Sequence, residues 1–102
     1  MALKKQYLKK NATCKVTFRL PREAVGDANR VALVGEFNDW SINSAPMTKL
    51  KDGSFKRVVS LEAGREYQYR YLIDETTWEN DWDADKYVRS EFGNCDNSVV
   101  VV

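Results

Sequence analysis

The fold class follows from one stretch of the chain, residues 66–74, EYQYRYLID. Large apolar side chains occupy every second position of it: Tyr67, Tyr69, Tyr71 and Ile73. Successive side chains of a strand point to opposite faces. The stretch therefore predicts a β-strand with an aromatic face toward a core, and with Gln68, Arg70 and Leu72 on the opposite face.

Similar patterns lie on both sides of this strand. Residues 13–20 and 54–61 alternate between apolar and polar side chains, and an Asp52-Gly53 hairpin signal precedes the second of them. The short apolar run at residues 31–35 predicts a strand buried on both faces, and residues 98–102 predict a closing strand. Six or seven short strands without a convincing helix predict an all-β fold, an antiparallel β-sandwich.

Three segments lack this periodicity. Residues 1–11 contain Lys4, Lys5, Lys9 and Lys10 and are expected to form a basic N-terminal arm or a short helical turn, with the domain itself at residues 12–102. The stretch from Pro21 to Asn29 is expected as a loop with one helical turn at most. Residues 74–97 are rich in Asp and Asn and are expected to form a long ordered loop or an irregular edge.

Composition excludes several classes of function. The 102 residues carry 16 Lys plus Arg against 15 Asp plus Glu, a formal net charge of +1, which argues against a dedicated nucleic-acid binder. The chain has no histidine, so a Ser-His-Asp triad and a histidine metal site are excluded. A chain of this size buries about two thirds of its unfolded surface, which is enough for one core.

Targeting and redox signals are few. The basic N-terminus is not followed by an apolar segment, so no secretory signal is predicted, and no apolar run is long enough for a membrane span. Cys14 and Cys95 make neither a disulfide framework nor a zinc site. We expect the cytoplasm as the compartment, with both thiols free; sequence alone leaves a bridge between the two open.

Candidate ligand-binding residues lie in the segments read as loops. Trp40, Trp78 and Trp82 are large aromatics in polar surroundings, where an indole either caps one end of the sandwich or binds a ligand. An indole face suits a ligand with an apolar face and polar edges, such as a sugar ring. Arg70, which projects from the face opposite the tyrosines, either lies on a solvated sheet face or offers a planar guanidinium to neighbouring hydroxyls.

Other readings of the sequence are weaker. The run Asp81-Trp82-Asp83-Ala84-Asp85 has alternating carboxylates, but Lys86 and Phe92 stand where an EF-hand needs Gly and Glu. A looser calcium site stays open, whereas a glycosidase carboxylate pair or a small hydrolase has no support, because nothing predicts a shifted carboxyl pKa. Stacking of single-stranded RNA on the basic and aromatic runs is disfavoured, because the tyrosines around Arg70 face the core.

A family resemblance appears when the segments are taken in order. They are VALVGEFNDW at residues 31–40, Pro46-Met47, Asp52-Gly53, YQYRYLID at 67–74, Trp78 and GNCDNSVV at 93–100. Together they resemble the early-set carbohydrate-binding domains of family 48. These are the N-terminal modules of isoamylases and glycogen-branching enzymes, and the glycogen-binding domain of the AMP-activated kinase β subunit. The resemblance covers roughly residues 13–102.

The resemblance implies an immunoglobulin-like, early-set β-sandwich that binds α-1,4-linked glucan without catalysis, cofactor or metal. Trp40 and Trp78 fall at the two platform tryptophans of the family, and Arg70 falls at its basic position. The terminal loop supplies the remaining sugar-contacting positions with Phe92, Asn94 and Asp96. The carboxylate of Asp96 replaces an amide and only accepts hydrogen bonds.

These expectations define a free-standing glucan-binding module with an apolar platform of two tryptophans. In the alternative, a domain of the same fold docks on a glucan-metabolising enzyme and binds no sugar. Exposure of Trp40 and Trp78 on one surface distinguishes the two. The resemblance gives Trp82 no role, and residues 75–77 lengthen the turn before Trp78 relative to the family's usual Asp-Gly version.

Overall fold

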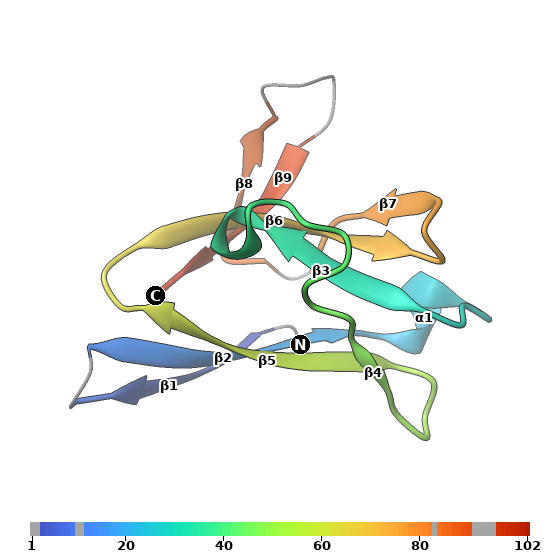
Figure 1. Ribbon diagram of the computed structural model, residues 1–102, viewed down its shortest axis with the longest axis horizontal. Coiled ribbons are helices and arrows are strands. Elements are labelled where there is room, and N and C mark those ends of the chain that lie inside the picture. The colour runs from blue at the N-terminus through green and yellow to red at the C-terminus, as the bar shows by residue number, and fades with distance from the viewer. Residues whose placement is uncertain (1–2, 10–11, 83, 91–95) are drawn as a thin grey trace.

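The computed structural model describes residues 3–9, 12–82, 84–90 and 96–102. Two antiparallel sheets pack face to face (Figure 1). Sheet A has the strand order β1-β2-β5-β4, with bounds Leu3–Leu8, Thr13–Leu20, Phe55–Glu62 and Thr48–Lys49. Sheet B has the order β3-β6-β9-β8, with bounds Val31–Gly35, Glu66–Ile73, Asp96–Val101 and Lys86–Arg89, and β7 at Thr77–Glu79 also pairs with β6. The predicted β-sandwich is confirmed.

The core forms where the apolar faces of the two sheets meet. Every second residue of β2 is buried, and so are the three tyrosines of β6. The ring of Phe18 contacts that of Tyr69 at 5.0 Å between centroids, and Tyr69 contacts Tyr71 at 5.9 Å, both edge to face. The alternation read from residues 66–74 is thus the inner face of sheet B.

The outer face of β6 is set by register with its neighbours. Arg70 pairs with Val34 of β3, and Gln68 pairs with Val99 of β9. Val34 and Val99 are both buried although they lie on the outer face of the sheet. This face is therefore covered in part, and Val31–Gly35 is buried on both faces as predicted.

Three segments differ from expectation or add to it. Residues 3–8 form the edge strand β1, paired along its whole length with β2, instead of an arm or a helical turn. The stretch 74–97, expected as a loop or an irregular edge, contains the short strands β7 and β8. The loop after β2 contains a single helical turn, α1, at Arg22–Val25. The expected boundary at residues 11 and 12 falls between the two strands of the β1–β2 hairpin and stays a prediction.

Contacts of Leu3 and Lys5 with the rest of the sandwich stabilise β1 at the edge of sheet A. Leu3 packs against the core cluster, and the ammonium group of Lys5 forms an ion pair of 2.7 Å with Asp85, which precedes β8 in sheet B. The sequence LKKQYL does not alternate between apolar and polar residues, so it does not predict a strand. In the structure, solvent exposure alternates along the first part of β1. No helix within the described residues has the length and apolar character needed to cross a membrane.

Candidate functional site

A hollow of about 460 Å³ lies on the outer face of sheet B. Three residues singled out from the sequence line it together: Trp40, Arg70 and Trp78. The remaining lining residues are Glu36, Ile42, Gln68, Ser90 and Asn97. Trp40 and Trp78 are 37% and 46% exposed, so both indoles are open to solvent on one surface. We call this surface the tryptophan hollow.

Trp40 reaches the hollow through a tight turn after β3. The side chain of Asn38 fastens this turn: its Oδ1 accepts from the amide of Gly35 at 3.1 Å, and its Nδ2 donates to the carbonyl of Leu33 at 3.0 Å. Asp39 and Trp40 then adopt left-handed backbone conformations, with φ of 55° and 59°. The amide of Trp40 donates to the carbonyl of Gly35 at 2.8 Å, which closes the turn.

The glycine before this turn is required by space. A Cβ at Gly35 would lie 2.6 Å from the carbonyl oxygen of Gln68 and 2.8 Å from Cβ of Tyr69. Gly35 therefore permits β3 to approach β6 closely at the point where the chain leaves the sheet. Phe37 then turns inward, with its ring 5.6 Å from that of Phe18 and 6.2 Å from that of Tyr67. The segment GEFNDW thus anchors one aromatic in the core and exposes the other.

Trp78 is placed by a tight turn between β6 and β7, in which residues 74–76 lie between the paired residues Ile73 and Thr77. Asp74 and Glu75 have φ of 49° and 64°, and the amide of Thr76 donates to the carbonyl of Ile73 at 3.1 Å. Positive φ at both central residues is the geometry of a type I′ turn. Trp78 pairs with Leu72, so its side chain lies on the outer face of the sheet. With three residues between Ile73 and Thr77, the connection is one residue longer than a two-residue Asp-Gly turn, as the sequence predicts.

Arg70 lies over Trp78. The guanidinium carbon of Arg70 is 5.3 Å from the centre of the Trp78 ring, a cation–π distance. Arg70 is half-buried, whereas the indole of Trp78 keeps almost half of its surface exposed. One edge of the hollow thus combines a flat apolar ring with a fixed cluster of N–H donors.

An amide pair also lines the hollow. Asn97 is only 5% exposed, and its Nδ2 donates to Oε1 of Gln68 at 2.9 Å. Its Oδ1 is buried and has no hydrogen-bond donor among the residues that the structure describes. A buried acceptor without a donor lowers the stability of the fold unless a ligand or water donates a hydrogen bond to it. The sequence places Gln68 on the outward face of its strand but gives no sign of a site there, and the apolar run of β9 has no alternation that would show the face of Asn97.

Of the three terminal-loop residues expected to contact the sugar, the structure describes one, Asp96. Asp96 is exposed and, by strand alternation, lies on the opposite face of β9 from Asn97. It is not among the residues that line the hollow. Phe92 and Asn94 lie outside the described residues, as does Cys95. Cys14 is a buried free thiol.

The acidic loop after β7 supplies a buried carboxylate, Asp81, that accepts hydrogen bonds from core tyrosines. Asp81 is 2% exposed, and one of its carboxylate oxygens accepts from the hydroxyls of Tyr69 and Tyr71 at 2.7 and 3.3 Å. Burial, more than the neighbouring carboxylate, raises the pKa of Tyr71 well above its ordinary value, and the pKa of Tyr69 is raised in the same way. Asp85 has Lys5 and the amide of Val101 as partners. Two of the three carboxylates considered for calcium thus have structural roles.

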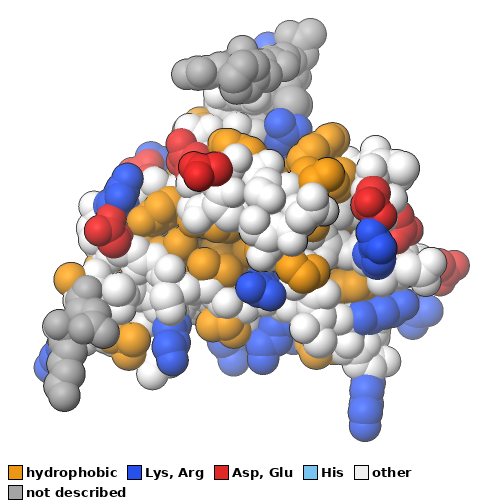
Figure 2. Space-filling model, in the orientation of Figure 1, with side chains coloured by type: hydrophobic (Ala, Val, Ile, Leu, Met, Phe, Trp, Pro, Cys, Tyr) orange, Lys and Arg blue, Asp and Glu red, His pale blue; other side chains and the backbone are white. Residues whose placement is uncertain are grey.

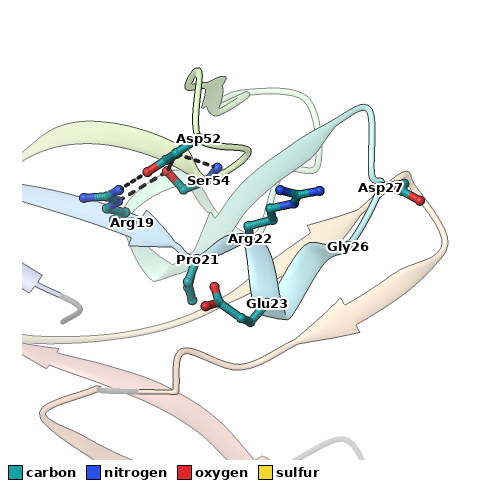
Figure 3. A pocket seen from close by; sticks show the side chains of 8 residues that line it. All are labelled: Arg19, Pro21, Arg22, Glu23, Gly26, Asp27, Asp52 and Ser54. Atoms are coloured by element: carbon teal, nitrogen blue, oxygen red, sulfur yellow. Dashed lines mark hydrogen bonds and ion pairs between the residues drawn. The ribbon is translucent and has the colours of Figure 1, made fainter.

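Trp82 stands apart from the hollow. It is 55% exposed, its Nε1 donates to a carboxylate oxygen of Glu79 at 3.2 Å, and it does not line the hollow. A larger hollow of about 640 Å³ lies near α1, where Arg19 bridges Asp52 and Ser54 (Figure 3). No aromatic side chain lines it, and its charged side chains are of both signs. It therefore lacks the stacking surface found in the tryptophan hollow.

The tryptophan hollow offers two partly exposed indoles, a guanidinium group and a buried acceptor. This set matches a ring with an apolar face and hydroxyl groups at its edge. No curated protein matches the chain. A family model described as the glycogen recognition site of AMP-activated protein kinase matches residues 15–102. The chain belongs to this family of non-catalytic, α-glucan-binding β-sandwich domains.

Proposed function

We propose that α-glucan binds in the tryptophan hollow, with Trp40 and Trp78 as the two stacking rings. The observation that carries this proposal is that both indoles are exposed and line one hollow on sheet B. A helical α-1,4-glucan presents a curved apolar surface with hydroxyls at its edges. Two rings that line one hollow can contact such a curved ligand at two places.

Polar contacts would fix the orientation of the sugar. Arg70 donates to neighbouring secondary hydroxyls, and Oδ1 of Asn97 accepts from one of them. A hydroxyl both donates and accepts, so one sugar ring can satisfy both side chains. Phe92, Asn94 and Asp96 stay predictions as further contacts, although Asp96 is not among the residues that line the hollow.

The affinity should be modest. The hollow is open to solvent and leaves most hydroxyls of the ligand in water. We therefore expect a dissociation constant of about 10⁻⁴ M for a short chain, or about −5.5 kcal/mol. A neutral ligand releases no counterions, so the affinity should stay the same across salt concentrations.

Calorimetric titration with β-cyclodextrin and with maltoheptaose tests the proposal. We expect saturable binding near the stated affinity, unchanged between low and high salt. The double variant Trp40→Ala/Trp78→Ala should not bind, while Trp82→Phe serves as the matched aromatic control. Binding that survives in the double variant, or an affinity for RNA that collapses with salt, would contradict the proposal.

A glucan-metabolising enzyme is the proposed protein partner, and sheet A is the face left free for it. Figure 2 shows Lys and Arg side chains along the side of the sandwich formed by this sheet. Lys4, Lys15 and Lys56 lie on its outer face by register, and none of them has an ion pair within the described part of the chain. A complementary enzyme surface would be acidic. Reversal of Lys15 and Lys56 to Glu should then weaken co-sedimentation with a branching enzyme and leave cyclodextrin binding intact.

The cytoplasm is the proposed compartment. Cys14 lies in the core as a free thiol, and a reducing compartment keeps such a thiol unmodified. Thiol counting on the native and the unfolded protein, after purification without reductant, tests this proposal.

A further inference from the structure

The sugar-facing surface of sheet B is assembled from two strands that meet end to end. β7 pairs with β6 along Tyr71–Ile73, and β9 pairs with β6 along residues 66–69. Both lie on the edge of β6 opposite β3, which itself pairs along residues 69–73. Arg70 falls between the two ladders. The strand that carries Trp78 and the strand that carries Asn97 are therefore not joined to each other by a backbone ladder.

Asn80 bridges this gap with its side chain. Its Nδ2 donates to the carbonyl of Asp96 at 2.7 Å. Its Oδ1 accepts from the amide of Ser98 at 3.0 Å and from the Ser98 hydroxyl at 2.8 Å. A carboxamide carries the same donor and acceptor as a peptide unit. The side chain of Asn80 thus takes the place of a strand neighbour for β9.

These bonds bracket Asn97. Asn80 holds the carbonyl of the residue before it and the amide of the residue after it. The backbone on both sides of Asn97 is therefore fixed, and strand alternation then sends its side chain outward to Gln68 and the hollow. The amide of Asp81 adds a bond of 2.8 Å to the hydroxyl of Ser98. Trp78 lies two residues before Asn80 on the same segment.

We infer that Asn80 is a positioning residue for glucan binding, acting through Asn97 and without touching the sugar. The inference rests on the proposed function of the hollow. An aspartate at position 80 has nearly the same shape but loses the donor, so a carboxylate oxygen would face the carbonyl of Asp96. The start of β9 would shift, and with it the buried acceptor of Asn97.

The test is a double-mutant cycle with β-cyclodextrin as the probe, measured by calorimetry well below the unfolding temperature. Asn80→Asp should weaken binding by about three- to tenfold, the range for one neutral hydrogen bond. In an Asn97→Ala background the same substitution should cause no further loss. Asn43→Asp adds the same charge on an exposed loop outside the hollow and should bind as the wild type.

Three results separate the claims. If the wild type does not bind β-cyclodextrin, the proposed function fails and this inference fails with it. If the wild type binds but Asn80→Asp binds equally well, or loses the same factor in both backgrounds, only the inference is overturned. If Asn80→Asp does not fold, NMR of the wild type decides. On saturation with β-cyclodextrin the side-chain NH₂ signals of Asn97 should shift and those of Asn80 should not; the reverse would overturn the inference.

Discussion

The guanidinium carbon of Arg70 lies 5.3 Å from the centre of the Trp78 ring, so the cation and the indole form one surface at the edge of the hollow. The cation holds the ring in place from one side, and the ring orients the fork of N–H donors. Arg70 and Trp78 come from adjacent strands, β6 and β7. This contact contributes to the burial of Arg70, which lies in mid-strand on a sheet face that is only partly covered.

Replacement of Arg70 by alanine should weaken glucan binding by about 1–3 kcal/mol, the range for hydrogen bonds that involve a charged group. Stability should change little, because Arg70 lies on the outer face and not in the core. Arg70→Lys keeps the charge but loses the planar fork and should bind at an intermediate level. Calorimetry with maltoheptaose and a thermal melt on each variant give both quantities. A large fall in melting temperature with unchanged affinity would make Arg70 structural.

Gly35→Ala should lower the free energy of unfolding by about 1–3 kcal/mol, the usual cost of forced overpacking. The added Cβ would meet the carbonyl oxygen of Gln68 at 2.6 Å, and backbone cannot yield as a flexible side chain can. β3 would have to move away from β6, which also displaces the turn that carries Trp40. Urea unfolding measures the cost. A variant as stable as the wild type would show that the close approach of β3 and β6 is not needed.

Glu75→Gly should raise the free energy of unfolding by up to about 1 kcal/mol. A side chain other than glycine costs about 1–2 kcal/mol in the left-handed region, and Glu75 has φ of 64°. Greater freedom of glycine in the unfolded chain offsets part of this gain. The exposed ion pair with Arg30 contributes little, and Arg30→Ala measures it separately. A loss of stability larger than that of Arg30→Ala would contradict the type I′ geometry of the turn.

Alkaline pH should destabilise the fold through Tyr69 and Tyr71. Burial raises the pKa of both phenols in the folded state, so they stay protonated at a pH where the same phenols of the unfolded chain ionise, which is about pH 10. A raised folded pKa stabilises the protein fully below the unfolded pKa, and this stabilisation is lost as the pH rises above it. Each phenol should contribute a slope of about 1.4 kcal/mol per pH unit.

The slope is obtained from urea unfolding between pH 8 and 11.5. Tyr71→Phe removes one of the two phenols, so its stability should fall less steeply with pH than that of the wild type. Equal slopes for the two proteins would show that Tyr71 ionises in the folded state.

The fold was predictable from local pattern because burial on one face of a strand leaves a period of two in the sequence. Residues 13–20 and 66–73 carry it clearly, and both are strands with one buried face. β1 was not predictable in this way, because its inward positions include Lys5, which forms an ion pair with Asp85, and Tyr7, which is largely exposed. β7 is only three residues long and gives no periodic signal.

The platform residues were predictable from the family motif, but the polar lining was not. Trp40, Arg70 and Trp78 do line one hollow. Asp96 and Asn97 are adjacent in the sequence, and a change of one residue in the register of a strand exchanges its faces. Only the pairing of β9 with β6 shows that Asn97, beside Gln68, is the residue that lines the hollow.

The most direct test is the change of intrinsic fluorescence on titration with maltoheptaose, followed in three proteins. Trp40 and Trp78 line the hollow, whereas Trp82 is exposed elsewhere. The wild type and Trp82→Phe should give saturable changes with similar affinity, and Trp40→Phe/Trp78→Phe should give no change. A signal that survives in the double variant and disappears in Trp82→Phe would place the ligand on the acidic loop, and the account of the tryptophan hollow would be wrong.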